Sequence, residues 1–152
     1  MPLDLDDDDL LELYNRRLIA AAAKVRADRR LARPDVTVER VSPLCGSRLT
    51  LDLRLEAGRV VEVGWAVRAC LLGQLGTAVL SEALPGRTLA EAREVGQAVR
   101  ALLRGEGPAP TGPWADLELL EPAAAMRNRH GSALLPFDAV EEALERSGPD
   151  QG

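Results

Sequence analysis

Two alternating segments joined by a short turn constrain the fold of this 152-residue chain more than any other feature. Leucines at every second position of residues 49–55 alternate with polar side chains, and valines and a tryptophan alternate in the same way over residues 61–67. This period predicts strands that each bury one face. Because Ala57 and Gly58 lie between the two strands, we expect them to form an antiparallel hairpin.

A third strand and several helices complete the expected arrangement. Residues 36–41 favour a strand, and Pro43 prevents it from continuing. A helical repeat occupies residues 10–30, before this strand. Further helices are expected over residues 71–84, 88–104, 116–120 and 132–146, with a Gly- and Pro-rich loop at 105–113. The predicted fold class is α+β, a small antiparallel three-stranded sheet with helices packed on one face.

The length of the chain indicates one domain, which we expect to span residues 10–146. The acidic residues 1–9 are predicted to be a flexible N-terminus, with a partner-binding acidic tail as the alternative. Residues 147–152 are predicted to be a flexible tail.

Composition argues against two classes of partner. The formal net charge is −5 at pH 7, whereas proteins that bind nucleic acid usually carry a concentrated basic face. No stretch approaches the roughly 18–20 apolar residues of a membrane span, and the start of the chain lacks a signal-peptide pattern. We therefore expect a cytoplasmic protein that binds neither nucleic acid nor membrane.

Three potential metal ligands lie far apart in the sequence, each at the boundary of an expected element. Cys45 lies in the turn between the first two strands, Cys70 begins a helix, and His130, the only histidine, precedes the last helix. Taken singly, a cysteine on an apolar helix is often core filler and a loop histidine is often only solvated. Amides at a helix N-terminus favour a thiolate, however, and the set of three favours one site.

Two thiols and one imidazole define the chemistry expected of that site. Cys₂His is a known ligand set for Zn²⁺, and thiolates also hold iron–sulfur clusters. The guanidinium groups of Arg127 and Arg129, which flank His130 on its N-terminal side, are placed to stabilise nearby thiolates or a persulfide.

Three short motifs surround the candidate ligands. Residues 42–47 have the sequence Ser-Pro-Leu-Cys-Gly-Ser, residues 69–76 contain Cys70, and residues 125–137 contain His130. These segments resemble Asn-Pro-x-Cys-Gly-Asp, Gly-Cys-x-x-x-x-Ala-Ser and Pro-x-Arg-x-x-Cys-Ala-x-Leu-x-Trp, the motifs of the NifU/IscU/SufU family of iron–sulfur cluster assembly scaffolds. The resemblance covers roughly residues 10–146, and the long gap between the second and third ligands is similar to that of the SufU branch.

The resemblance implies a ligand set and a function. Cys45, Cys70 and His130 are expected to hold a [2Fe–2S] cluster or Zn²⁺, with His130 in place of the family's third cysteine. Ser47 stands where the family has an acidic ligand, and it is a weak ligand. The implied function is that of a scaffold or carrier, with a cysteine desulfurase as sulfur donor and apo iron–sulfur proteins as recipients.

Two other functions stay open on the sequence. The SufU branch implies a zinc-dependent sulfurtransferase that accepts persulfide sulfur on Cys45, with Arg127 steering the sulfur anion. Alternatively, the substitutions at Ser47 and His130 mark a diverged protein that binds no metal and acts through interactions alone.

Overall fold

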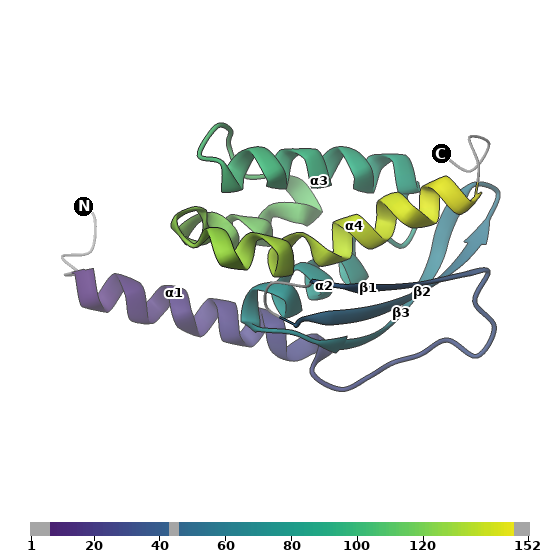
Figure 1. Ribbon diagram of the computed structural model, residues 1–152, viewed down its shortest axis with the longest axis horizontal. Coiled ribbons are helices and arrows are strands. Elements are labelled where there is room, and N and C mark those ends of the chain that lie inside the picture. The colour runs from purple at the N-terminus through teal and green to yellow at the C-terminus, as the bar shows by residue number, and fades with distance from the viewer. Residues whose placement is uncertain (1–6, 43–45, 148–152) are drawn as a thin grey trace.

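A three-stranded antiparallel sheet forms one layer of the structure, and helices form the other (Figure 1). This computed structural model describes residues 7–42 and 46–147, with side chains from residue 15 onward. The strands follow one another across the sheet in chain order: β1 (Val36–Val41), β2 (Arg48–Glu56) and β3 (Arg59–Arg68). The prediction of an α+β fold with a small antiparallel sheet is confirmed.

The β2–β3 hairpin forms where the alternating pattern predicted it. Leu51 lies opposite Trp65, so the apolar side chains of the two strands share one face of the sheet. Ala57 and Gly58 connect the strands with φ angles of 52° and 78°. Two successive positive φ angles match the right-handed twist of the flanking strands, which is why this short turn closes the hairpin.

The described part of the chain also contains four α-helices and three 3₁₀ segments. The α-helices are α1 (Asp7–Ala22), α2 (Leu71–Ala83), α3 (Leu89–Leu103) and α4 (His130–Ser147). The 3₁₀ segments are η1 (Ala23–Val25), η2 (Gly112–Ala125) and η3 (Arg127–Arg129). None of the helices in the described ranges is long and apolar enough to cross a membrane.

The hydrophobic core lies between the sheet and helices α2 and α4, which also pack against each other. It consists mostly of Leu, Val and Ala, because aromatic residues make up only 3% of the chain. Helix α3 packs on α4 (Figure 1). There Phe137 of α4 fits against Gly96 of α3, where an added Cβ would come within 3.0 Å of the Phe137 side chain.

The first helix is shorter than its sequence pattern predicts. The helical repeat extends over residues 10–30, but α1 ends at Ala22 and η1 follows it. The sheet binds the next residues: Arg29 N donates to Trp65 O and Trp65 N donates to Arg29 O, which adds a short antiparallel bridge at the edge of β3. These contacts with a distant strand outweigh the local helical preference.

A 3₁₀ segment replaces the short helix expected at residues 116–120. Segment η2 continues through Pro122, and four of its five buried residues recur at every third position: Trp114, Leu117, Leu120 and Ala123, with Leu119 as the fifth. A 3₁₀-helix has three residues per turn, so this spacing buries one continuous stripe.

A buried carboxylate anchors the segment between η1 and β1 on the sheet. Asp52 of β2 is fully buried and accepts hydrogen bonds from Arg30 Nε at 2.6 Å, Leu31 N at 3.0 Å and Thr37 Oγ1 at 2.7 Å. Burial raises the pKa of this carboxyl, but the three donors and the charge of Arg30 outweigh it, so the pKa of Asp52 lies below its ordinary value.

Replacing this carboxylate should destabilise the fold in a pH-dependent way. We expect Asp52→Asn to lower the free energy of unfolding at pH 7 by about 2 kcal/mol, because charge-assisted hydrogen bonds are lost. Since the pKa of Asp52 is lower in the folded state, its contribution is present above the unfolded-state pKa of about 4 and is lost as the pH falls through the folded-state pKa. Urea unfolding at pH 7 and pH 3 measures both effects.

The exposed Asp116→Asn is the matched control and should change stability little. Equal stability of the wild type and Asp52→Asn at pH 7 would contradict the anchoring role. A stability difference that is as large at pH 3 as at pH 7 would contradict the lowered pKa.

Candidate functional site

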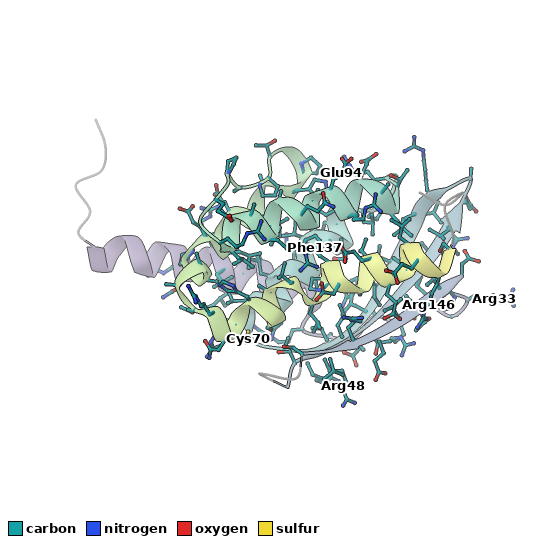
Figure 2. All side chains as sticks on the ribbon, turned by 45° about the horizontal axis from the view of Figure 1, so that its top comes forward. Arg33, Arg48, Cys70, Glu94, Phe137 and Arg146 are labelled. Carbon is teal, nitrogen blue, oxygen red and sulfur yellow. The ribbon has the colours of Figure 1, made fainter. Side chains whose placement is uncertain are left out.

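Cys70 is the N-cap residue of α2 and lies where the chain leaves β3 (Figure 2). Its side chain is partly exposed. The backbone N–H groups of Leu72 and Gly73, in the first turn of the helix, lie close enough to the sulfur to lower the pKa of the thiol. Free amides at a helix N-terminus stabilise negative charge, so the fold places the thiol where a thiolate is favoured.

Two buried serines lie beside Cys70. Ser132 Oγ is 3.3 Å from Cys70 Sγ and 2.9 Å from Ser47 Oγ. Ser132 is fully buried and Ser47 is 4% exposed, so water has little access to either hydroxyl. The turn before β2, the first turn of α2 and the first turn of α4 therefore meet at one cluster of three side chains, Cys70, Ser47 and Ser132.

A cleft of about 440 Å³ opens over this cluster. Its wall includes Arg129 of η3, whose guanidinium lowers the pKa of the Cys70 thiol. The described lining contains no carboxylate and consists of Gly46, Ser47, Arg68, Ala69, Cys70, Asn128 and Arg129. A negatively charged sulfur in this cleft has cationic neighbours and no anionic ones.

These surroundings shift the protonation of the thiol. Burial raises the pKa of Cys70, but the hydroxyl of Ser132, the amides of Gly73 and Leu72 and the guanidinium of Arg129 together hold it below its ordinary value. A thiolate is both a soft metal ligand and a nucleophile, so Cys70 has the chemistry that either role requires.

Cys45, the other predicted thiol ligand, lies outside the described residues. The described residues on its two sides are joined by two backbone hydrogen bonds, from Gly46 N to Ser42 O at 2.8 Å and from Ser42 N to Ser47 O at 2.7 Å. Gly46, the next residue in sequence, lines the Cys70 cleft together with Ser47. The roles of Cys45 as ligand and sulfur acceptor stay predictions.

His130 is not brought to Cys70 in this structure. Its Nε2–H donates to Ala123 O at 2.9 Å, and because a carbonyl only accepts, Nε2 carries the proton. The side chain lines a separate pocket together with Arg127. The geometry instead places Ser132 and Arg129 next to the Cys70 sulfur, where the sequence analysis expected His130 and Arg127.

The third motif, over residues 125–137, contains a signal for Ser132 that the sequence prediction missed. When its Arg-x-x-Cys-Ala-x-Leu-x-Trp portion is aligned on Arg129, Ser132 takes the place of the cysteine, Ala133 follows it, and Phe137 takes the aromatic position. The prediction matched the arginine of the motif to Arg127, which puts His130 at the cysteine position, whereas a match to Arg129 shifts the alignment by two residues to Ser132.

The described donors around Cys70 do not by themselves make up a zinc site. Within residues 7–42 and 46–147, no three His, Cys, Asp or Glu side chains gather into a metal-binding group. Adding Cys45 would give two thiols and two hydroxyls, whereas zinc in proteins usually takes its ligands from Cys, His and carboxylates.

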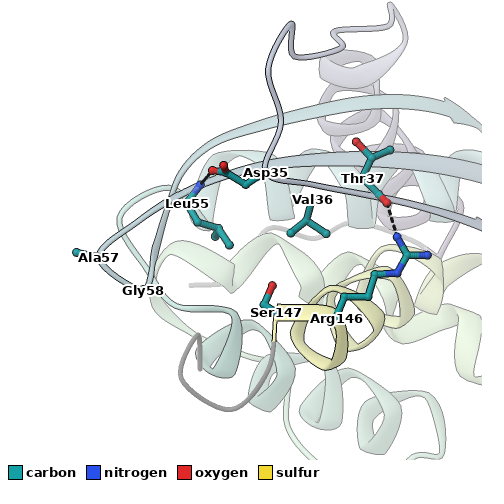
Figure 3. Close-up of a pocket in the computed structure, with 8 residues that line it drawn as sticks. All are labelled: Asp35, Val36, Thr37, Leu55, Ala57, Gly58, Arg146 and Ser147. Carbon is teal, nitrogen blue, oxygen red and sulfur yellow. Dashed lines mark hydrogen bonds between the residues drawn. The ribbon is translucent and has the colours of Figure 1, made fainter.

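Figure 3 shows a larger cleft, of about 590 Å³, and Figure 2 shows that Arg146, one of its lining residues, lies well away from Cys70. It is lined by residues of β1, of the β2–β3 turn and of the end of α4. Two of its polar side chains have partners within the fold: Arg146 Nη1 donates to Thr37 O, and Asp35 Oδ2 accepts from Leu55 N. Its lining contains neither thiol nor imidazole, so the Cys70 cleft is the better candidate site.

Removing the Ser132 hydroxyl should slow the reaction of Cys70 with an alkylating reagent. In a Cys45→Ser background, which leaves Cys70 as the single thiol, we expect Ser132→Ala to raise the thiol pKa, because a donor to the thiolate is lost. The rate of iodoacetamide alkylation against pH gives the pKa directly.

Ser81→Ala is the matched control, since Ser81 Oγ donates to a backbone carbonyl of α2 away from the site. An unchanged pKa in Ser132→Ala, or an equal shift in Ser81→Ala, would contradict a direct contact between Ser132 and the thiolate.

Comparison with known proteins identifies the relatives of this fold. The model of the NifU-like N-terminal domain matches residues 19–117. A nitrogen-fixing NifU-like protein (N-terminal) from Brucella abortus is 35% identical over 90% of this chain and 95% of that chain, with a TM-score of 0.82. No curated protein matches.

A second solved structure supports the fold alone. It is described as an iron–sulfur cluster assembly scaffold protein for the SUF system from Fervidobacterium islandicum AW-1. It is 18% identical over 86% of this chain and 96% of that chain, with a TM-score of 0.76. The domain match and the Brucella relative confirm the predicted family: the chain belongs to the NifU-like N-terminal domain family.

Proposed function

We propose that this chain is an iron–sulfur cluster assembly scaffold that holds its cargo through Cys70 and Cys45. The observation that carries the proposal is the Cys70 sulfur, which faces an open cleft at the N-terminus of α2, with Ser132 Oγ at 3.3 Å and Arg129 in the same cleft wall. Membership of the NifU-like family supports it. Apo iron–sulfur proteins are the recipients that such a function requires.

The donors at the site favour a cluster that is held weakly. Thiolates are the usual ligands of iron–sulfur clusters, and Cys70 and Cys45 would supply two of them. Ser132 and Ser47 are buried, and their hydroxyls are hydrogen-bonded to each other. Neutral hydroxyls bind iron more weakly than thiolates do. We expect a cargo held by two protein thiolates to leave readily, which suits a carrier.

The same contacts favour sulfur acceptance as a second function. In this step the Cys70 thiolate attacks the outer sulfur of a donor persulfide. A new S–S bond forms to Cys70, the donor's S–S bond breaks, and the donor leaves as a thiolate, so no external oxidant or reductant is needed. Arg129 would then stabilise the terminal sulfur anion. Acceptance on Cys45, as the sequence analysis predicts, is the alternative.

Chemical reconstitution tests the assignment of the cargo ligand. Under anaerobic conditions with ferrous iron and inorganic sulfide, the wild type should bind iron and sulfide and show visible thiolate-to-iron charge-transfer absorption. Cys70→Ser should lose most of both, because a thiolate ligand is removed. Serine is a favourable N-cap residue, so α2 should remain folded in this variant.

His130→Ala is the control that separates the two ligand assignments, and it should reconstitute like the wild type. Ser132→Cys places a third thiol beside Cys70 and should increase the iron retained after desalting. A wild type that stays colourless would contradict the scaffold proposal. Loss of the cluster in His130→Ala would contradict the ligand set.

A further inference from the structure

The first 33 residues of the chain carry two clusters of opposite charge. Residues 1–13 contain no basic residue, and their acidic residues are Asp4, Asp6, Asp7, Asp8, Asp9 and Glu12. Residues 24–33 contain one acidic residue, Asp28, and their basic residues are Lys24, Arg26, Arg29, Arg30 and Arg33. A chain with a net charge of −5 therefore also contains a concentrated basic segment. The function proposed for Cys70 uses neither cluster.

The backbone of the basic segment is fixed against β3. Ala27 O accepts a hydrogen bond from Trp65 Nε1 at 3.0 Å, and Arg29 and Trp65 exchange two backbone hydrogen bonds. Gly64 of β3 allows this close approach, because an added Cβ there would lie 2.6 Å from Arg29 O. The segment therefore presents its side chains from a rigid backbone, which reduces the entropy that a binding partner would cost.

Two basic side chains of the segment already have carboxylate partners. Lys24 Nζ lies 2.9 Å from Glu82 Oε1, and Arg30 Nε lies 2.6 Å from Asp52 Oδ2. The other three are exposed and form no ion pair with any residue that the structure describes: Arg26, Arg29 and Arg33. We define these three side chains as the arginine surface. Its positive charge is available to a binding partner.

Helix α1 keeps the two clusters apart within one molecule. It begins at Asp7 and has 16 residues, so it is about 24 Å long. Figure 1 shows its start beyond the other helices at one end of the molecule, and Figure 2 shows Arg33 at the opposite end. The first turn of α1, which carries Asp7, Asp8 and Asp9, is therefore too far from the arginine surface for the two to pair within one chain.

We propose that the arginine surface of one copy docks the acidic N-terminal cluster of a second copy of this chain. Charge complementarity carries the inference: five aspartates in residues 4–9 would face three guanidinium groups that lack a partner in their own chain. Several charge-assisted hydrogen bonds made together are worth more than an isolated surface ion pair. The contact needs no metal and is independent of the function proposed for Cys70.

Charge reversal on either side of the contact tests it without threatening the fold. Arg26→Glu/Arg33→Glu changes two exposed side chains of the arginine surface. Asp4→Lys/Asp6→Lys changes two acidic residues that precede α1, so the charges of the first helical turn are kept.

A matched control makes the same change in net charge elsewhere. Arg93→Glu/Arg104→Glu alters two exposed side chains, one on α3 and one at its C-cap. Figure 1 shows α3 on the helical side of the molecule, away from the coil that follows η1.

Sedimentation equilibrium of the full chain, metal-free and with a thiol reductant, measures the contact at low and at moderate salt. We expect a wild-type mass above the 16.3 kDa of one chain that rises with protein concentration and falls with salt. The association constant should fall about tenfold in each charge-reversed variant and change less than about twofold in the control. An equimolar mixture of the two reversed variants should associate again, because the new lysines of one would face the new glutamates of the other.

Four results would overturn the proposal. They are a wild type that keeps the mass of one chain at low salt, a loss in the control equal to that in the reversed variants, a mixture that stays monomeric, and association that salt does not weaken. Titration with a single-stranded oligonucleotide tests nucleic acid as the occupant. Binding that Arg26→Glu/Arg33→Glu abolishes, in a wild type that does not self-associate, would assign the surface to nucleic acid and overturn the proposal.

Discussion

The candidate site depends on the close approach of α4 to α2. A Cβ at Gly73 would come within 2.8 Å of Ser132 Oγ, and one at Gly76 within 3.0 Å of the Pro136 ring. Because both positions lack a side chain, the first turn of α4 reaches the start of α2 and Ser132 lies 3.3 Å from the Cys70 sulfur. Larger residues at these positions would push the two helix starts apart. Cys70 would then keep its amide donors but lose the hydroxyl beside it.

The fold could be predicted where each element carries its own pattern. Strands β2 and β3 alternate by themselves, and their turn residues favour a hairpin, so no distant contact was needed to expect them. The end of α1 could not be predicted in this way. The helical repeat continues beyond Ala22, and the chain leaves the helix because Arg29 pairs with Trp65 and Asp52 anchors the segment that follows. These contacts join residues that are far apart in sequence.

The sequence predicted only part of the site, because the packing of α4 against α2 joins residues that are far apart in sequence. A cysteine at a helix start suggests a thiolate from sequence alone, and the structure gives Cys70 the donors for it. Ser132 was missed because a serine has little chemistry of its own, and only its packing next to Cys70 gives it a role. His130 has the stronger chemistry, yet its Nε2–H is bonded to the Ala123 carbonyl. The motif alignment decided the sequence prediction, whereas the packing of α4 decides which side chain lies beside Cys70.

The central claim is that the residue beside Cys70 in the site is Ser132 and not His130. Because the chain has a single histidine, labelling with [¹⁵N]histidine marks His130 alone. Pulsed electron paramagnetic resonance of the reduced, reconstituted cluster then measures whether a histidine nitrogen is bound to iron. We expect spectra that are the same for ¹⁴N- and ¹⁵N-histidine protein. A strong nitrogen coupling that changes with the label would show His130 as a ligand and contradict this account.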